Sequence, residues 1–274
     1  GKTPKIGVRN MGSKLISIGC SFTAHTSYPE FKYWDSYLAE YLNLELHNYA
    51  RGGTGGPTHF YNLIEAVATH GNDIDTIVVG WTQWKRFSFP YISGYKSNLN
   101  PPYAAFVHDG KLYKDIYQLY SANERQAVME SIKSAYALMY AVTALADSIN
   151  AKLIITQLLP ALNKEATKFT DGYLYLSDLY RCTEDNEVFW RLRDDKRLIG
   201  FPFLNKLGGY SICSGPEWVP SLHTVNKPET KSIIDLTKPD ISVSDKFQID
   251  AHPNQEGHKY IFNKYKDAYD EIYK

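Results

Sequence analysis

The sequence has little cysteine and no excess of either charge. Cysteine occurs only three times in 274 residues, at Cys20, Cys182 and Cys213. Thiols so few and so scattered exclude a disulfide scaffold and a cysteine-based zinc site, and their odd number fits a reducing compartment. Lysine with arginine and aspartate with glutamate each total 30, so the formal net charge is zero. Because a neutral chain lacks a long-range field that attracts polyanions, we expect neither nucleic acid nor a membrane as a partner.

Long hydrophobic runs are also absent. No segment contains the roughly 20 consecutive apolar residues that cross a bilayer. The first residues, GKTPKIGVRN, are basic but lack the apolar core of a secretory signal, and the MGSKLISIG that follows is typical of a natural start. We interpret residues 1–10 as a vector-derived or disordered segment and expect a soluble, cytoplasmic protein. Histidine and carboxylate residues do not recur at metal-ligand spacing, so the sequence predicts no metal and no other cofactor.

The chain does contain enough apolar residues for a full core, since 43% of it is hydrophobic. Short apolar segments alternate with segments of helical periodicity, which is typical of an α/β fold around a parallel sheet. The predicted strands are 14–19, 45–50, 75–80 and 151–157, and the predicted helices are 33–44, 124–150, 183–195 and 252–274. Another helix is predicted within 52–71, after a glycine-rich turn, with Pro57 near its first turn and Gly71 just past its end. The remainder is irregular, so we expect one domain, 11–274, with two large insertions at 85–121 and 160–245.

Residues suited to acyl transfer follow the predicted strands. Ser21 in GCSFT comes directly after the first strand, Gly53 in NYARGGTGG after the second, and Thr82 and Gln83 in GWTQWKR after the third. In parallel sheets the reactive groups gather beyond the carboxyl ends of the strands, so these three loops should lie at one edge. A hydroxyl there, with glycine amides nearby, is typical of a nucleophile whose oxyanion is stabilised by N–H groups.

The stretch IDAHPNQEGH, 249–258, precedes the last predicted helix and adds a base to this set. Asp250 and His252 are two residues apart, so in an extended segment both side chains point the same way and can form a relay with Ser21. The alternative is that Pro253 ends a strand and Asn254 caps the helix, with no role for His252 in catalysis.

These four motifs resemble those of the SGNH, or GDSL-type, hydrolases. The family pattern is G-D-S-[LF]-[ST], then N-x-x-x-x-G, G-x-N and D-x-x-H-P, and here GCSFT, NYARGG, GWT and DAHPN stand in that order. The resemblance implies a three-layer, flavodoxin-like α/β fold, with Ser21 as nucleophile, His252 as base and Gly53 as an oxyanion donor. GCSFT together with LIGFPFLNKLGG, 198–209, is also similar to proteins encoded by tailed bacteriophages.

The chain departs from the family pattern at two places. Thr82 stands where the family has an asparagine that holds the oxyanion, and losing one such donor costs about 3 kcal/mol of transition-state stabilisation. We expect the Thr82 hydroxyl or the Gln83 amide to replace it. Asp250 lies two residues before His252 and not three, so the loop geometry of the family does not carry over.

Other candidates have more ordinary interpretations. Cys20 beside the serine is expected to be a small packed residue, and His258 an exposed or packing residue of the last helix. The glycines of 52–56 lack the lysine of a phosphate-binding loop. Trp81, Trp84 and Arg86 could form a stacking surface for a sugar or base, or the two indoles could be part of the core.

The sequence therefore predicts a serine ester hydrolase that works through acyl-Ser21. We expect its substrate to be a small acyl ester of a sugar or another polar alcohol, because the insertions are rich in Tyr and Trp and poor in long aliphatic runs. Two alternatives stay open: an acyltransferase that uses the same residues, and a non-catalytic phage structural or binding module.

Overall fold

The computed structural model describes the elements that surround the predicted site. The described residues are 12–26, 28–82, 84, 89–90, 103–104, 124–159, 186–199, 212–214, 222–225 and 249–274. Residues 1–10, most of the two predicted insertions, and the candidate site residues Gln83 and Arg86 lie outside them.

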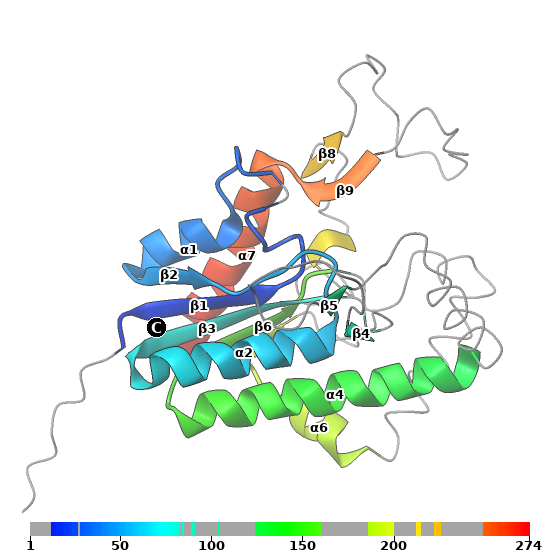
Figure 1. The fold of residues 1–274 in the computed structure, drawn as a ribbon. Coiled ribbons are helices and arrows are strands. Elements are labelled where there is room, and N and C mark those ends of the chain that lie inside the picture. The colour runs from blue at the N-terminus through cyan, green and yellow to red at the C-terminus, as the bar shows by residue number, and fades with distance from the viewer. Residues whose placement is uncertain are drawn as a thin grey trace, which may run out of the picture.

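A parallel five-stranded sheet forms the centre of the domain (Figure 1). Its strands are β1 (Lys14–Gly19), β2 (Glu45–Asn48), β3 (Ile74–Trp81), β6 (Lys152–Gln157) and β7 (Leu198–Ile199). They pair in the order β2-β1-β3-β6-β7, all parallel. Numbered within the sheet this is the order 2-1-3-4-5, which is that of flavodoxin-like folds. The predicted fold class is therefore confirmed.

Helices cover both faces of this sheet. In Figure 1, α1 (Trp34–Leu42) and α7 (Gln255–Tyr273) lie on one face, and α2 (Gly56–His70), α4 (Glu124–Ser148) and α6 (Glu187–Asp194) on the other. Successive strand residues point to opposite faces, and so Val78 packs with α1 and α7, whereas Ile77 and Val79 pack with α2, α4 and α6. Coverage of both faces explains why the inner strands β1, β3 and β6 are mostly apolar.

The base motif lies outside the central sheet, in a small antiparallel pair. Strand β9 (Ile249–Pro253) pairs with β8 (His223–Val225), and Thr224 lies opposite Asp250. Asn254 then caps α7, because its Oδ1 accepts a hydrogen bond from the Gly257 amide at 3.0 Å. The interpretation of Pro253 and Asn254 as strand end and helix cap is thus confirmed, and the cap is made without His252.

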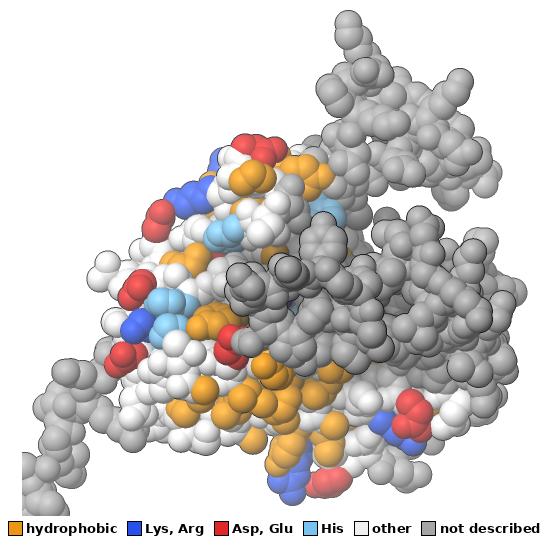
Figure 2. Space-filling model, viewed as in Figure 1, with side chains coloured by type: hydrophobic (Ala, Val, Ile, Leu, Met, Phe, Trp, Pro, Cys, Tyr) orange, Lys and Arg blue, Asp and Glu red, His pale blue; other side chains and the backbone are white. Residues whose placement is uncertain are grey.

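Four short elements complete the described chain: the paired strands β4 (Phe89–Pro90) and β5 (Tyr103–Ala104), and two 3-10 helices, η1 (Gly71–Asp73) and η3 (Ile212–Ser214). Figure 2 shows hydrophobic side chains gathered over α2, α4 and α6, where Tyr61, Ile64, Tyr140 and Trp190 are the large exposed ones. Within the described ranges, no helix combines the length and the hydrophobicity that crossing a membrane requires.

Candidate active site

The predicted site residues follow three adjacent strands at one edge of the sheet. Ser21 comes after β1, Gly53 after β2 and Thr82 after β3, and β1 lies between the other two strands. The chain reverses its direction of winding between β1 and β3, and ligands of open α/β sheets bind at the carboxyl ends of the strands at such a point. The topology therefore places all three residues where a ligand is expected.

The nucleophile turn, residues 20–25, is closed by its own backbone. The amides of Thr23 and Ala24 both donate to the Cys20 carbonyl at 2.9 Å. Gly19 has no room for a side chain, because a Cβ there would lie 2.3 Å from the Thr23 Oγ. Cys20 is fully buried, as predicted for a packed residue, while Ser21 is half-buried.

The glycines after β2 lie directly against this turn. A Cβ placed on Gly52 would be 3.7 Å from the Cβ of Ser21. Gly53 follows with φ of 72°, a left-handed conformation that side chains disfavour. The Arg51 amide also donates to the Gly19 carbonyl at 3.1 Å. The predicted oxyanion loop and the predicted nucleophile are thus brought together, and Gly52 is the glycine whose backbone approaches Ser21.

Thr82 is fully buried beyond the end of β3, and its hydroxyl has no hydrogen-bond partner among the described residues. Its carbonyl accepts a hydrogen bond from the side-chain Nε2 of Gln157 at 2.9 Å, which fixes the backbone at this point. A buried hydroxyl without a partner loses the solvation that water would provide. Such a group is suited to donate to an oxygen that arrives with a substrate.

The two tryptophans of the third motif belong to the core. Trp81 and Trp84 are 1% and 6% exposed. Trp84 Nε1 donates to Gln157 Oε1 at 2.9 Å, and its ring lies edge-on to Tyr136. This burial favours the packing interpretation over a stacking surface for a substrate.

His252 lies beside the nucleophile turn. Its half-buried ring is 4.9 Å from the Phe22 ring and 5.9 Å from the Tyr28 ring, measured between centroids. Since Phe22 is the neighbour of Ser21, the predicted base lies close to the turn that carries the predicted nucleophile. Asp250 is positioned by the pairing of β9, but its side chain lies outside the described part of the structure. Its contact with His252 stays a prediction.

A buried polar network behind the nucleophile turn escaped the sequence-based prediction. Asp35 in the first turn of α1 is fully buried. Its Oδ1 lies 2.7 Å from His25 Nε2, and its Oδ2 accepts from Asn48 Nδ2 at 2.6 Å. A signal for it exists in YWDSYLAEYL, because Asp35 shares a helix face with Leu38 and Ala39, where an apolar residue is expected.

The pKa values of two histidines in this region are shifted in opposite directions. Burial opposes the charge of His25, but the hydrogen bond and the charge of Asp35 outweigh it and raise the pKa of His25 above its usual 6.5. Burial lowers the pKa of His258 to about 4, against the attraction of Asp35 and with added repulsion from His25 and His252. His258 is therefore neutral at physiological pH and serves as a packing residue.

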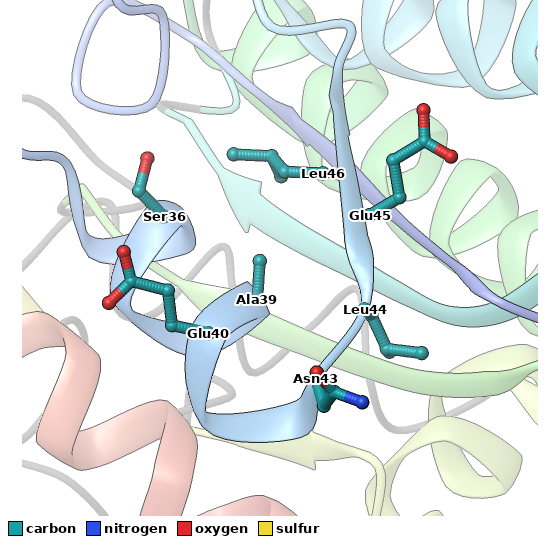
Figure 3. Close-up of a pocket in the computed structure, with 7 residues that line it drawn as sticks. All are labelled: Ser36, Ala39, Glu40, Asn43, Leu44, Glu45 and Leu46. Atoms are coloured by element: carbon teal, nitrogen blue, oxygen red, sulfur yellow. The ribbon is translucent and has the colours of Figure 1, made fainter.

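A pocket of about 500 Å³ lies elsewhere in the fold, between the end of α1 and the start of β2 (Figure 3). It is lined by Ser36, Ala39, Glu40, Asn43, Leu44, Glu45 and Leu46. Because β2 is parallel to β1, this pocket is at the amino ends of the strands, opposite to Ser21. We do not assign the reaction to it.

No protein-family model and no curated protein sequence matches the chain. Its fold is similar to that of the psychrotrophic esterase EstA from Pseudoalteromonas sp., in a structure inhibited by monoethylphosphonate, with 10% identity, a TM-score of 0.44 and coverage of 94% of this chain and 97% of that one. For TesA the identity is 11%, the TM-score 0.43 and the coverage 94% and 98%.

A third solved structure is a protein from Slackia heliotrinireducens described as a candidate SGNH hydrolase, with 12% identity, a TM-score of 0.36 and coverage of 94% and 98%. Likeness at TM-scores below 0.5 does not define an activity.

Proposed function

We propose that the chain is a serine ester hydrolase in which Ser21 forms the acyl-enzyme. The observation that carries this proposal is the approach of Gly52 to within 3.7 Å of the Ser21 side chain, measured from a Cβ placed on the glycine. A serine at the switch point of the sheet thereby lies against the glycine loop that would supply oxyanion donors, and the His252 ring packs on its neighbour Phe22.

The proposed reaction uses only groups from the loops that follow β1, β2 and β3 and from strand β9. His252 takes the proton of Ser21 while the serine oxygen attacks the acyl carbon, and Asp250 orients the imidazole. The amides of Ser21 and Gly53 and the hydroxyl of Thr82 donate to the oxyanion. When the intermediate collapses, the alcohol leaves with the proton from the base, and water then repeats these steps on the acyl-enzyme.

The rings near the base support a polar alcohol as the leaving group. The leaving oxygen must be next to His252, because His252 returns the proton to it. Tyr28 is half-buried there, and a partly exposed aromatic ring can pack against the apolar face of a sugar or a similar polar alcohol. An acyltransferase would use the same residues, with a second alcohol in this place. That alcohol would compete with water for the acyl-enzyme.

Fluorophosphonate labelling of the purified protein tests the proposal. One probe mass should be added to the wild type and none to Ser21→Ala, whereas the matched control Ser148→Ala, on an exposed serine of α4, should be labelled like the wild type. Labelling that persists in Ser21→Ala would show that the nucleophile is another residue. A wild type that takes up no probe and hydrolyses no ester would favour the binding-module alternative.

A further inference from the structure

One side-chain amide connects the two halves of the proposed site. Asn48, the last residue of β2, donates through Nδ2 to the Thr23 carbonyl at 2.8 Å and to the Asp35 carboxylate at 2.6 Å. Its Oδ1 accepts from the Ala50 amide at 2.9 Å. Thr23 belongs to the nucleophile turn, and Ala50 begins the segment that leads to Gly52. Asn48 therefore ties the turn with the nucleophile to the loop with the oxyanion donors.

The carboxylate of Asp35 holds that amide in place. Oδ2 binds Asn48, while Oδ1 lies 2.7 Å from His25 Nε2 and accepts from the Ser36 amide at 2.9 Å. A fully buried carboxylate is stable only when hydrogen bonds and a counter-charge replace water. When it is protonated, His25, whose side chain is 38% exposed, supplies that charge from within the nucleophile turn.

We propose that Asp35 is a positioning residue for the reaction of Ser21. Its ion pair with His25 and its hydrogen bond to Asn48 fix the nucleophile turn relative to the glycine loop. The inference rests on the proposed hydrolase activity and adds to it a residue pair that does not touch the substrate. Misplacement of a reacting group by about 1 Å costs about a hundredfold in rate, so this network acts on kcat more than on KM.

The pair also makes the network sensitive to pH. His25 faces Asp35 and the Tyr33 ring at 4.5 Å, and His258 lies on that same tyrosine at 4.2 Å. Burial holds the pKa of His258 at about 4, whereas Asp35 raises the pKa of His25 above its usual 6.5 against the effect of burial, so of these two histidines His25 keeps its proton to the higher pH. When His25 loses its proton, the buried carboxylate loses its counter-charge, and the turn with Ser21 is held less firmly.

The test compares Asp35→Asn with Glu40→Gln, which neutralises an exposed carboxylate of the same helix. Ester kinetics and the rate of fluorophosphonate labelling are measured with the melting temperature, and NMR follows the titration of His25. We expect Asp35→Asn to lower kcat and the labelling rate about a hundredfold, with KM unchanged and the His25 titration moved to lower pH. Glu40→Gln should behave like the wild type in all of these. Unchanged kcat in folded Asp35→Asn would overturn the inference.

His25→Gln is the second variant, for the case that Asp35→Asn does not fold. Glutamine still donates to Asp35 but carries no charge, and the half-exposed position tolerates it. We expect a lower kcat that no longer decreases on the alkaline side, where the wild type loses the His25 proton. An unchanged alkaline limb contradicts the positioning role, and complete loss of labelling would make His25 the base in place of His252. A wild type without labelling refutes the proposed hydrolase itself, which separates the two failures.

Discussion

The two segments that form the proposed site are held in different ways. The nucleophile turn is fixed by hydrogen bonds to buried polar side chains, chiefly Asn48 and Asp35. The base segment is fixed by backbone pairing of β9 with β8, by the Asn254 cap and by ring contacts of His252. A nucleophile has to keep one position relative to its oxyanion donors, whereas a base needs a side chain whose protonation can change. The two kinds of support match these two requirements.

The same contrast occurs at a smaller scale around Tyr33. His25 and His258 both pack on its ring, at 4.5 and 4.2 Å. The partner Asp35 raises the pKa of His25, so the pairing stabilises the fold below pH 6.5 and is lost as pH rises through the higher folded value. Burial lowers the pKa of His258, so its contribution to stability is fully present above pH 6.5 and is lost as pH falls toward the folded value of about 4. One ring thus separates two groups with opposite pH dependence.

The largest effect is expected in the base segment. His252→Ala should lower kcat by about a millionfold, as for loss of the base of a serine relay, and should leave the melting temperature nearly unchanged. The matched variant is Asn254→Ala, which should cost about 1 kcal/mol of stability through the lost cap and leave turnover per folded molecule intact. Turnover and thermal unfolding measured on both variants separate catalysis from helix capping. Normal turnover in His252→Ala would leave only the capping role for this segment.

Asp250→Asn should have the next largest effect. An amide in place of the carboxylate can favour the tautomer that has no free Nε2 for the serine proton, and the expected loss in kcat is about ten-thousandfold. KM should change little, because Asp250 is not expected to touch the substrate. Steady-state kinetics of the variant provide the measurement. A loss below tenfold would mean that another group orients His252 and that the relay ends at the histidine.

Thr82 tests the proposed oxyanion donors, which lie beside the nucleophile turn. Thr82→Val keeps the shape and removes the hydroxyl, so kcat should decrease about a hundredfold with little change in KM. The melting temperature should not decrease, because the buried hydroxyl has no partner to lose among the described residues. Thr76→Val is the control for kcat, because it removes a buried hydroxyl near the amino end of β3, where Thr76 donates to Asp75 and lies away from the proposed site. If only Gln83→Ala lowers kcat, the glutamine replaces the family asparagine; if neither does, only backbone donors remain.

The regular elements could be predicted from the sequence because their signals are local. The apolar run of β1 predicts the bounds 14–19 that the structure has. The periodicity of α4 and the cap of α7 likewise depend on residues close together in the sequence. Strand β7 was not predicted, because two residues carry no periodicity and its place is decided by pairing with β6. Short strands of this kind depend on partners distant in the sequence.

The site could be predicted only where motifs mark it. Ser21, the glycines and His252 are predicted from the order of their motifs along the chain, and the structure places the glycine loop and the His252 ring near the turn that contains Ser21. The link of Asp35 to Asn48 and His25 could not be found in this way. Its three members come from a turn, a helix and a strand, and the sequence around each of them does not predict contact with the other two.

The smallest effect concerns His258 and is confined to acid pH. With the pKa at about 4 in the fold and 6.5 in the unfolded chain, the unfolded state takes up the proton first as pH falls. This should cost about 2 kcal/mol of stability between pH 6.5 and pH 5. His258→Phe fills the same space against Tyr33 without a titrating group, so its stability should decrease less over that interval, and its activity at neutral pH should be unchanged. Urea unfolding at both pH values gives the two differences. Equal decreases in the variant and the wild type would mean that His258 takes up its proton in the folded protein as readily as in the unfolded chain, and that the contrast with His25 does not hold.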